Sequence, residues 1–144
     1  MIRRSPVEAV LTSVVSTLAG STGVSGLATG GVFNNVPQGT AYPYIEVTSP
    51  ATSRVDTFSR FGADVPVAVK VVSQAKGDQA PARILNACIV ALGGEGGSNV
   101  LTLAAPHRSL GITWDNDDRY AETVNGITTR YHVGMFRVWT EQTS

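Results

Sequence analysis

Few residues of the chain could carry chemistry, and their spacing does not assemble a reaction. His107 and His132 are the only histidines. His132 lies between Tyr131 and Val133 in an alternation typical of a strand, which favours a ring with satisfied hydrogen bonds over a general base. His107 follows Ala105-Pro106 in an expected loop. A hydrolase would have to be built on His107 with a nearby Ser or Asp.

Motifs for a nucleophile, a metal or a nucleotide are missing from the sequence. Cys88, the only cysteine, falls in the apolar stripe of an expected helix, which predicts a buried and inert thiol. The run 115–118 begins like a calcium loop, but the sixth and twelfth loop positions hold Tyr120 and Gly126 instead of Gly and Glu. The glycines of 93–97 lack the Lys-Ser/Thr pair of a phosphate loop. We therefore expect no catalytic residue, no metal site and no cofactor, and we interpret 115–119 as a polar turn.

The charge of the chain argues against a nucleic-acid-binding protein. Lys+Arg and Asp+Glu both number 11, so the net charge is zero, and the basic residues are scattered along the sequence. Proteins that hold DNA without sequence specificity need a basic excess or a basic stripe. Only 15% of the residues are charged, against roughly 25% in an average domain. Such a surface is easily desolvated, which favours a subunit that works packed against other proteins.

The length of 144 residues fits one domain spanning residues 1–144. A signal peptide would need an unbroken apolar run near the start, but the apolar residues there are periodic. No stretch approaches the roughly 20 apolar residues of a membrane-spanning helix. We expect a soluble domain that is made in the cytoplasm and does not enter a membrane.

Two amphipathic helices are expected. Ser5-Pro6-Val7-Glu8 predicts a capping box at the start of the first helix, which ends near Ala19-Gly20. A glycine-rich connector follows over 20–31. The second helix has Asp78 as its N-cap and ends at Gly93-Gly94. The predicted apolar stripes are Val7, Val10, Leu11, Val14, Val15 and Leu18 in the first helix, and Ile84, Leu85, Cys88, Ile89 and Leu92 in the second.

The remaining segments alternate as strands do. Strands are expected near Tyr44–Thr48 after a proline-containing turn, over 64–74 with Val65, Val67, Val69 and Val71 on one face, and at 100–103, 110–114, 119–124 and 127–140. Asn125-Gly126 joins the last two and is the strongest short hairpin signal. The predicted fold class is α+β, with a single, mainly antiparallel sheet and both helices packed on one face.

The segment 49–63 lacks sustained periodicity, and loops of this length in a compact domain are often functional. It carries Phe58 and Phe61, with Arg54 and Arg60 beside them. Aromatic and arginine side chains are enriched in protein–protein interfaces. We therefore predict a partner-contacting loop with Phe58 and Phe61 as anchors and Arg54 and Arg60 as rim residues; the alternative is a surface loop without a partner.

The order of these elements resembles a known family. Val32-Phe33-Asn34-Asn35-Val36-Pro37-Gln38-Gly39 and Tyr42-Pro43-Tyr44-Ile45, after an amphipathic helix and a glycine-rich connector, resemble the tail-completion family of long-tailed bacteriophages. Its members are tail terminators or tail-to-head joining proteins. The resemblance continues through the valine-rich strand, the helix that begins near Asp78 and the last strand, Tyr131–Trp139.

The resemblance implies a ring, usually of six subunits, that caps the completed tail tube in the virion neck. Its partners would be further copies of itself, the tail tube protein and the head connector or stopper protein, and DNA would pass through its lumen without being read. Two alternatives stay open. The protein could be a head-completion protein on the portal side of the neck, or a stand-alone small binding module.

Overall fold

Six strands form one sheet beside three helices in the described part of this computed structural model, which is residues 2–56, 60–93 and 101–143. In chain order the elements are α1 (Val7–Gly20), α2 (Thr22–Ser25), β1 (Val32–Phe33), β2 (Tyr44–Thr48), β3 (Ser53–Arg54), β4 (Phe61–Ser73), α3 (Gln79–Ala91), β5 (His107–Val124) and β6 (Ile127–Gln142). No helix in these ranges is long and apolar enough to cross a bilayer.

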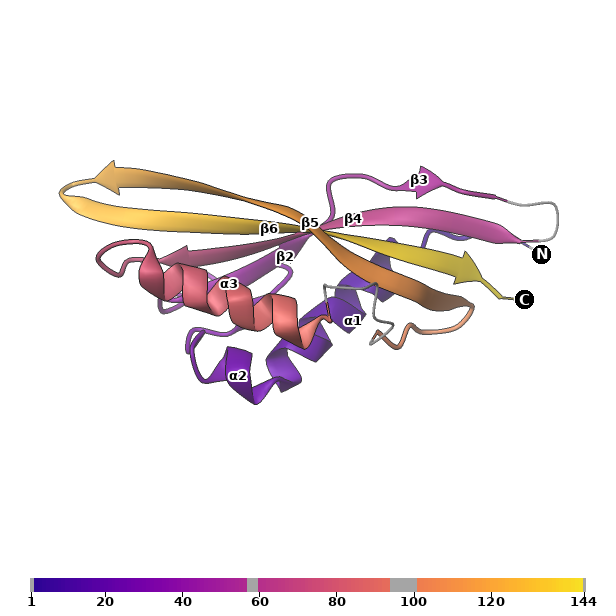
Figure 1. Cartoon of the computed structure of the whole chain (residues 1–144), viewed down its shortest axis with the longest axis horizontal. Helices are drawn as coiled ribbons and strands as arrows, with labels where there is room; N and C mark the ends of the chain where they lie inside the picture. Colours follow the sequence, from indigo (N-terminus) through magenta and orange to yellow (C-terminus); the bar gives the residue numbers. More distant parts are fainter. Residues whose placement is uncertain (1, 57–59, 94–100, 144) are drawn as a thin grey trace.

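The sheet has the order β1-β2-β4-β6-β5, and β3 pairs with β4 beside this path. All pairings are antiparallel except that of β1 with β2. The helices lie on one face, and the other face carries none of them (Figure 1). The predicted α+β class and the mainly antiparallel sheet are confirmed. The short α2, within the expected connector, was not predicted.

The core lies between the helices and one face of the sheet. Strand β4 places Val65, Val67, Val69 and Val71 on this face, and all four are fully buried as their alternation predicted. Helix α1 buries Val10, Val14 and Leu18 against them, and α3 buries Ile84, Leu85 and Cys88. Burying one such aliphatic side chain contributes about 1.5–3 kcal/mol. This packing holds α1, whose β-branched residues have modest helix propensity.

Strands β5 and β6 form a long hairpin that extends past the helices (Figure 1). Asn125 and Gly126 have φ of 52° and 77°, which confirms the predicted turn. The predicted polar turn at 115–119 is wrong, because β5 runs through it and pairs with β6, with a register shift between Trp114 and Asn116. Polar residues are tolerated there because β5 is the edge strand, and β6 supplies the hydrogen-bonding ladder.

The ends of several elements differ from their predictions. Ser5 does not form the expected capping box: helix α1 begins at Val7, and the Ser5 hydroxyl lies 3.4 Å from the Val7 N–H. Asp78 is the N-cap of α3, but it makes no side-chain capping bond. The predicted strand at 100–103 is absent from its described part, 101–103. Strand β4 starts three residues earlier than expected, at Phe61. Residues 61–63 pair with β6, and Ala63 also pairs with Arg54 of β3.

Candidate partner-contact surface

Three of the four predicted contact residues lie at the end of the sheet that also holds both chain termini (Figure 1). Arg54 is on β3, Arg60 precedes β4, and Phe61 is the first residue of β4. Phe58 lies outside the described residues. The segment 49–63 is not one irregular loop, because β3 pairs with β4 and the Val55 N–H donates to the Gly62 carbonyl at 2.9 Å.

Asp56 organises one half of this end. Its carboxylate accepts hydrogen bonds from the guanidinium of Arg3, from Nη2 of Arg54 at 2.8 Å and from the Gly62 N–H at 3.2 Å. These donors, Arg3 first, hold the pKa of Asp56 far below its usual value. Asp56 therefore stays ionised and ties the N-terminal segment to the β3–β4 connection.

Glu141 organises the other half. It lies on β6, is almost completely buried, and accepts hydrogen bonds from Arg60 and from Arg108 Nε at 2.6 Å. The hydrogen bond from Arg60 is the main cause that lowers the pKa of Glu141, with Arg108 adding to it. A buried carboxylate needs such partners. Glu141 thus positions two arginines whose outer surfaces remain in solvent.

We call the group Arg3, Arg4, Arg54, Arg60 and Arg108 the arginine end. Four of these arginines bind two carboxylates: Arg3 and Arg54 bind Asp56, and Arg60 and Arg108 bind Glu141. The side chains of Arg54, Arg60 and Arg108 are 71%, 59% and 56% exposed. Because a guanidinium group has five N–H donors, these ion-paired arginines keep donors for a further acidic partner.

Phe61, one of the two predicted anchors, lies beside Arg3. It is half-buried, and the Arg3 guanidinium lies 4.3 Å from the centre of its ring. Phe61 also lines a pocket of about 160 Å³, together with Pro6, Ala63 and residues of the arginine end. The contact role of Arg54, Phe58, Arg60 and Phe61 stays a prediction.

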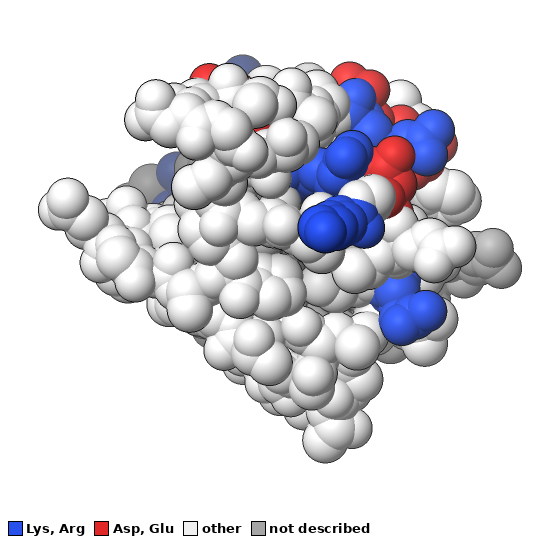
Figure 2. All heavy atoms as spheres, turned by 90° about the vertical axis from the view of Figure 1, so that its left-hand side faces the viewer, with Lys and Arg blue, Asp and Glu red and all other residues white. Residues whose placement is uncertain are grey.

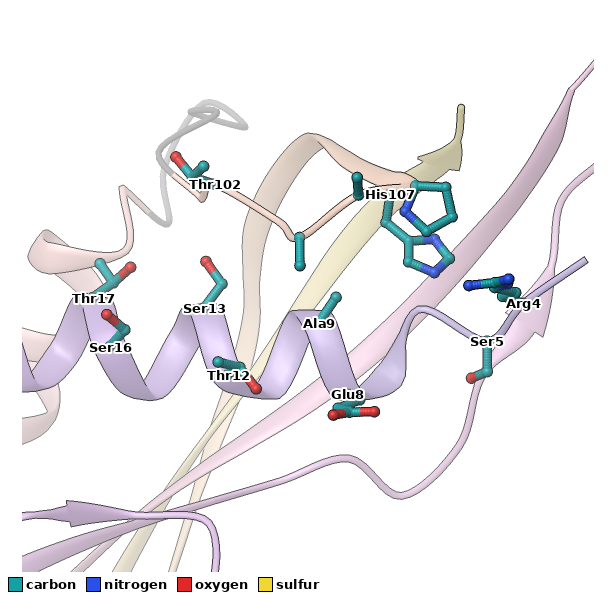
Figure 3. Close-up of a pocket in the computed structure, with 13 residues that line it drawn as sticks. Arg4, Ser5, Glu8, Ala9, Thr12, Ser13, Ser16, Thr17, Thr102 and His107 are labelled. Atoms are coloured by element: carbon teal, nitrogen blue, oxygen red, sulfur yellow. The ribbon is translucent and has the colours of Figure 1, made fainter. Parts of the chain in front are cut away.

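A larger groove of about 820 Å³ runs along helix α1 (Figure 3). Helix α1 forms one wall, with Ala9, Ser13 and Thr17 turned toward 102–107, and that segment contributes the other wall. His107 lies at one end near Arg4; burial first and Arg4 second lower its pKa. Among the described residues, the His107 ring makes no hydrogen bond to a Ser, Asp or Glu side chain.

Cys88 and His132 are both buried in the fold. Cys88 is buried as predicted, and burial raises its pKa to about 12. His132 is 1% exposed, and its Nε2 lies 3.2 Å from Oδ1 of Asp78, so its ring has a partner as predicted. The hydrogen bond from His132 is the main cause that lowers the pKa of Asp78. The described ranges contain no cluster of three or more potential metal ligands.

The helix-free face of the sheet carries an aromatic row. Tyr120 stacks on Tyr131 with ring centres 4.6 Å apart, and Lys70 lies 5.7 Å from the centre of Tyr131. Lys70 also pairs with Glu46 at 3.0 Å. The alternation of β6 had placed Tyr131 on this face, but Tyr120 was missed because it fell in a segment interpreted as a turn and short strand.

Charge is distributed unevenly over the surface. No residue from Ala9 to Ile45 is charged, and this stretch includes most of α1, all of α2 and strand β1. Figure 2 shows the result: its lower part is free of charged side chains, and Lys, Arg, Asp and Glu gather in the upper right. Helix α2 and most of α1 thus present a surface without charged side chains.

The fold is shared with a virion subunit. A chain from the structure "Virion of native gene transfer agent (GTA) particle" matches with a TM-score of 0.81 and 19% identity, over 96% of this chain and 99% of that chain. The family model described as "Tail completion protein gp17" matches residues 12–141. The chain belongs to this family of phage tail-completion proteins, as its sequence pattern had indicated, and is a structural protein of the virion. No curated protein matches the chain.

Proposed function

We propose that the protein, acting as a single domain of residues 1–144, forms a ring that terminates the tail tube and joins it to the head connector. The observation that carries the proposal is the membership in the tail-completion family over residues 12–141. The ring would contain about six copies, by the family resemblance. Each ring would contact the tail tube protein on one side and the connector or stopper protein on the other.

The described surface supports a subunit with several partners. It offers an uncharged surface on α2 and most of α1, an uncovered sheet face with an aromatic row, and an arginine end with exposed donors. These surfaces lie on different sides of the molecule, so a subunit can contact a neighbour in the ring and still meet other proteins. A contact between two different surfaces is heterologous, and such contacts close into a ring when the rotation between copies permits it.

Termination would follow from the difference between the two sides of the ring. One side would give the last ring of the tail tube the contacts it expects, and the other side would present a surface on which tube protein cannot continue. The role requires no catalytic residue and no cofactor. DNA would pass through the lumen without sequence-specific contacts, which agrees with a net charge of zero.

The proposal is tested with particles that lack the protein. We expect tails of irregular length and free heads, and we expect that added purified protein restores the attachment of heads to tails. Normal tails that remain joined to heads in its absence would contradict the proposal. Attachment of the protein to isolated heads, before any tail is present, would favour a head-completion protein instead.

A further inference from the structure

We propose that the outer part of the β5–β6 hairpin of one copy docks on the arginine end of a neighbouring copy. We call this part, residues 115–130, the hairpin arm. The inference rests on the proposed ring and names the contact between its subunits. It is carried by the exposure of the arm, by the opposite charges of the two surfaces, and by the distance between them within one chain.

The hairpin arm is the most exposed part of the sheet. All residues from Asp115 to Ile127 are exposed, including the apolar side chains of Tyr120, Val124 and Ile127, each more than half accessible. Strand β5 is the edge strand, so one row of its backbone N–H and C=O groups faces away from β6. An exposed edge of this length pairs readily with other chains unless charges restrict it. The hairpin arm is therefore suited to bind another chain, and its charges determine which chain it can bind.

The charges of β5 define that partner. Between 115 and 124 the strand carries four acidic residues, Asp115, Asp117, Asp118 and Glu122, and one basic residue, Arg119. This is a local excess of three negative charges. Arg137 lies 3.6 Å from Asp115. Asp118 accepts a hydrogen bond from the Arg119 N–H and Glu122 one from the Tyr131 hydroxyl, but within the described ranges neither these two carboxylates nor that of Asp117 has an ion-pair partner. The acidic residues would repel a second acidic edge and attract a basic surface.

The arginine end is the matching surface on the same chain. It has five arginines, four of which share the two carboxylates of Asp56 and Glu141, and Arg54 and Arg60 are both mostly exposed. A pocket of about 160 Å³ lies among them, with Pro6, Phe61 and Ala63 in its lining, and it would receive an apolar side chain of the arm tip. Charge complementarity and an apolar socket together specify a second copy of this chain.

The two surfaces cannot meet within one molecule. Asp118 lies opposite Val133 on β6, whereas Phe61, next to Arg60, lies opposite Gln142. Nine residues of an extended strand separate these two levels, about 30 Å at about 3.3 Å per residue. The contact must form between copies, with a different surface on each side, as a closed ring requires.

DNA phosphate is the competing ligand for the arginines. Two observations favour the second copy. The complementary acidic surface exists on the same chain, and the whole chain has no net positive charge. DNA binding at this end is therefore an outcome of the test that would overturn the proposal.

The first experiment exchanges charges between the two surfaces and measures the protein bound to tails that lack it. We expect Asp117→Lys with Asp118→Lys, and separately Arg54→Glu with Arg60→Glu, to reduce assembled protein roughly tenfold or more, because each variant sets like charges against each other. A mixture of the two variants should restore assembly, since every contact in an alternating ring is then complementary. Lys76→Glu with Arg83→Glu matches the charge change of the arginine variant away from the contact and should assemble normally.

The second experiment detects the contact directly. Asp118→Cys protein mixed with Arg60→Cys protein should form a disulfide-linked heterodimer on tails, whereas Asp118→Cys mixed with Arg83→Cys should not. Cys88 is buried and does not interfere.

Rings of normal mass with no cross-link and no effect of charge reversal would overturn the arm contact and leave the proposed ring intact. The arm contact would also be overturned if the Arg54→Glu, Arg60→Glu variant assembled normally but lost binding to duplex DNA. A wild-type protein that never assembles on tails would overturn the ring itself.

Discussion

Arg108 holds Glu141 with two nitrogens, because its Nε and Nη2 both lie 2.6 Å from Oε2 of the nearly buried carboxylate. Arg60 binds the other carboxylate oxygen. This clamp joins the start of β5, the start of β4 and the end of β6, and it fixes the place where three predicted contact residues meet. The arginine end is therefore a built part of the fold rather than a set of loose surface side chains.

The clamp predicts how stability depends on pH. The pKa of Glu141 in the folded protein is lowered from 4.5, so its contribution is complete above 4.5 and is lost as pH falls through the lower folded-state pKa. Glu141→Gln should therefore be less stable than wild type at neutral pH, and the difference should shrink in acid. Urea titrations at several pH values measure this. An unchanged difference at low pH would show that the charge of Glu141 does not act through the clamp.

Gly30 should not tolerate a side chain. A Cβ atom built there lies 1.9 Å from the Ala41 carbonyl oxygen and 2.8 Å from that of Pro43, so the backbone around β1 and β2 would have to move. We expect Gly30→Ala to destabilise the protein by about 1–3 kcal/mol, as overpacking does. Gly20→Ala is the matched control, because nothing lies within 4 Å of its Cβ. Equal melting temperatures for the two variants would contradict the close packing of Gly30 against the carbonyl oxygens of Ala41 and Pro43.

Cys88 should react only after unfolding. It is fully buried on α3, and its pKa of about 12 keeps it a protonated thiol at neutral pH. A thiol reagent should modify the native protein at the rate of global or local opening and the unfolded protein at once. Stoichiometric, rapid labelling of the native protein would contradict the packing of α3 on the sheet.

The aromatic residues of the predicted loop give a separate test. Phe61→Ser should lower stability modestly, because it removes a half-buried ring and its contact with Arg3, and should weaken assembly on tails. Phe58→Ser should leave the fold intact and also weaken assembly, as the sequence predicts for an anchor. Circular dichroism melting separates stability from assembly, which is measured as joined particles. Normal joining by the stably folded Phe58→Ser variant would remove Phe58 from the contact surface.

The parts of the fold with strong periodicity could be predicted from the sequence. Val65, Val67, Val69 and Val71 alternate on a buried strand, and Asn125-Gly126 marks the hairpin. Residues 119–124 of β5 were also predicted as a strand. The stretch 115–118 was not, because it is exposed and buries no side chain that would leave a pattern. Its conformation is imposed by pairing with β6.

The candidate site was predicted only in part for a similar reason. Arg54, Arg60 and Phe61 stood out as interface residue types within one segment. Their partners Arg3, Arg108 and Glu141 come from distant parts of the chain, and no spacing in the sequence connects them. The charge excess of the arginine end exists only after the sheet has brought these segments together.

Electron cryo-microscopy of the intact neck tests the central claim most directly. We expect a closed ring of this chain between the last ring of the tail tube and the head connector, with each copy contacting the next. A reconstruction in which the chain is absent from the virion, or is attached on the portal side without touching the tail tube, would contradict the account.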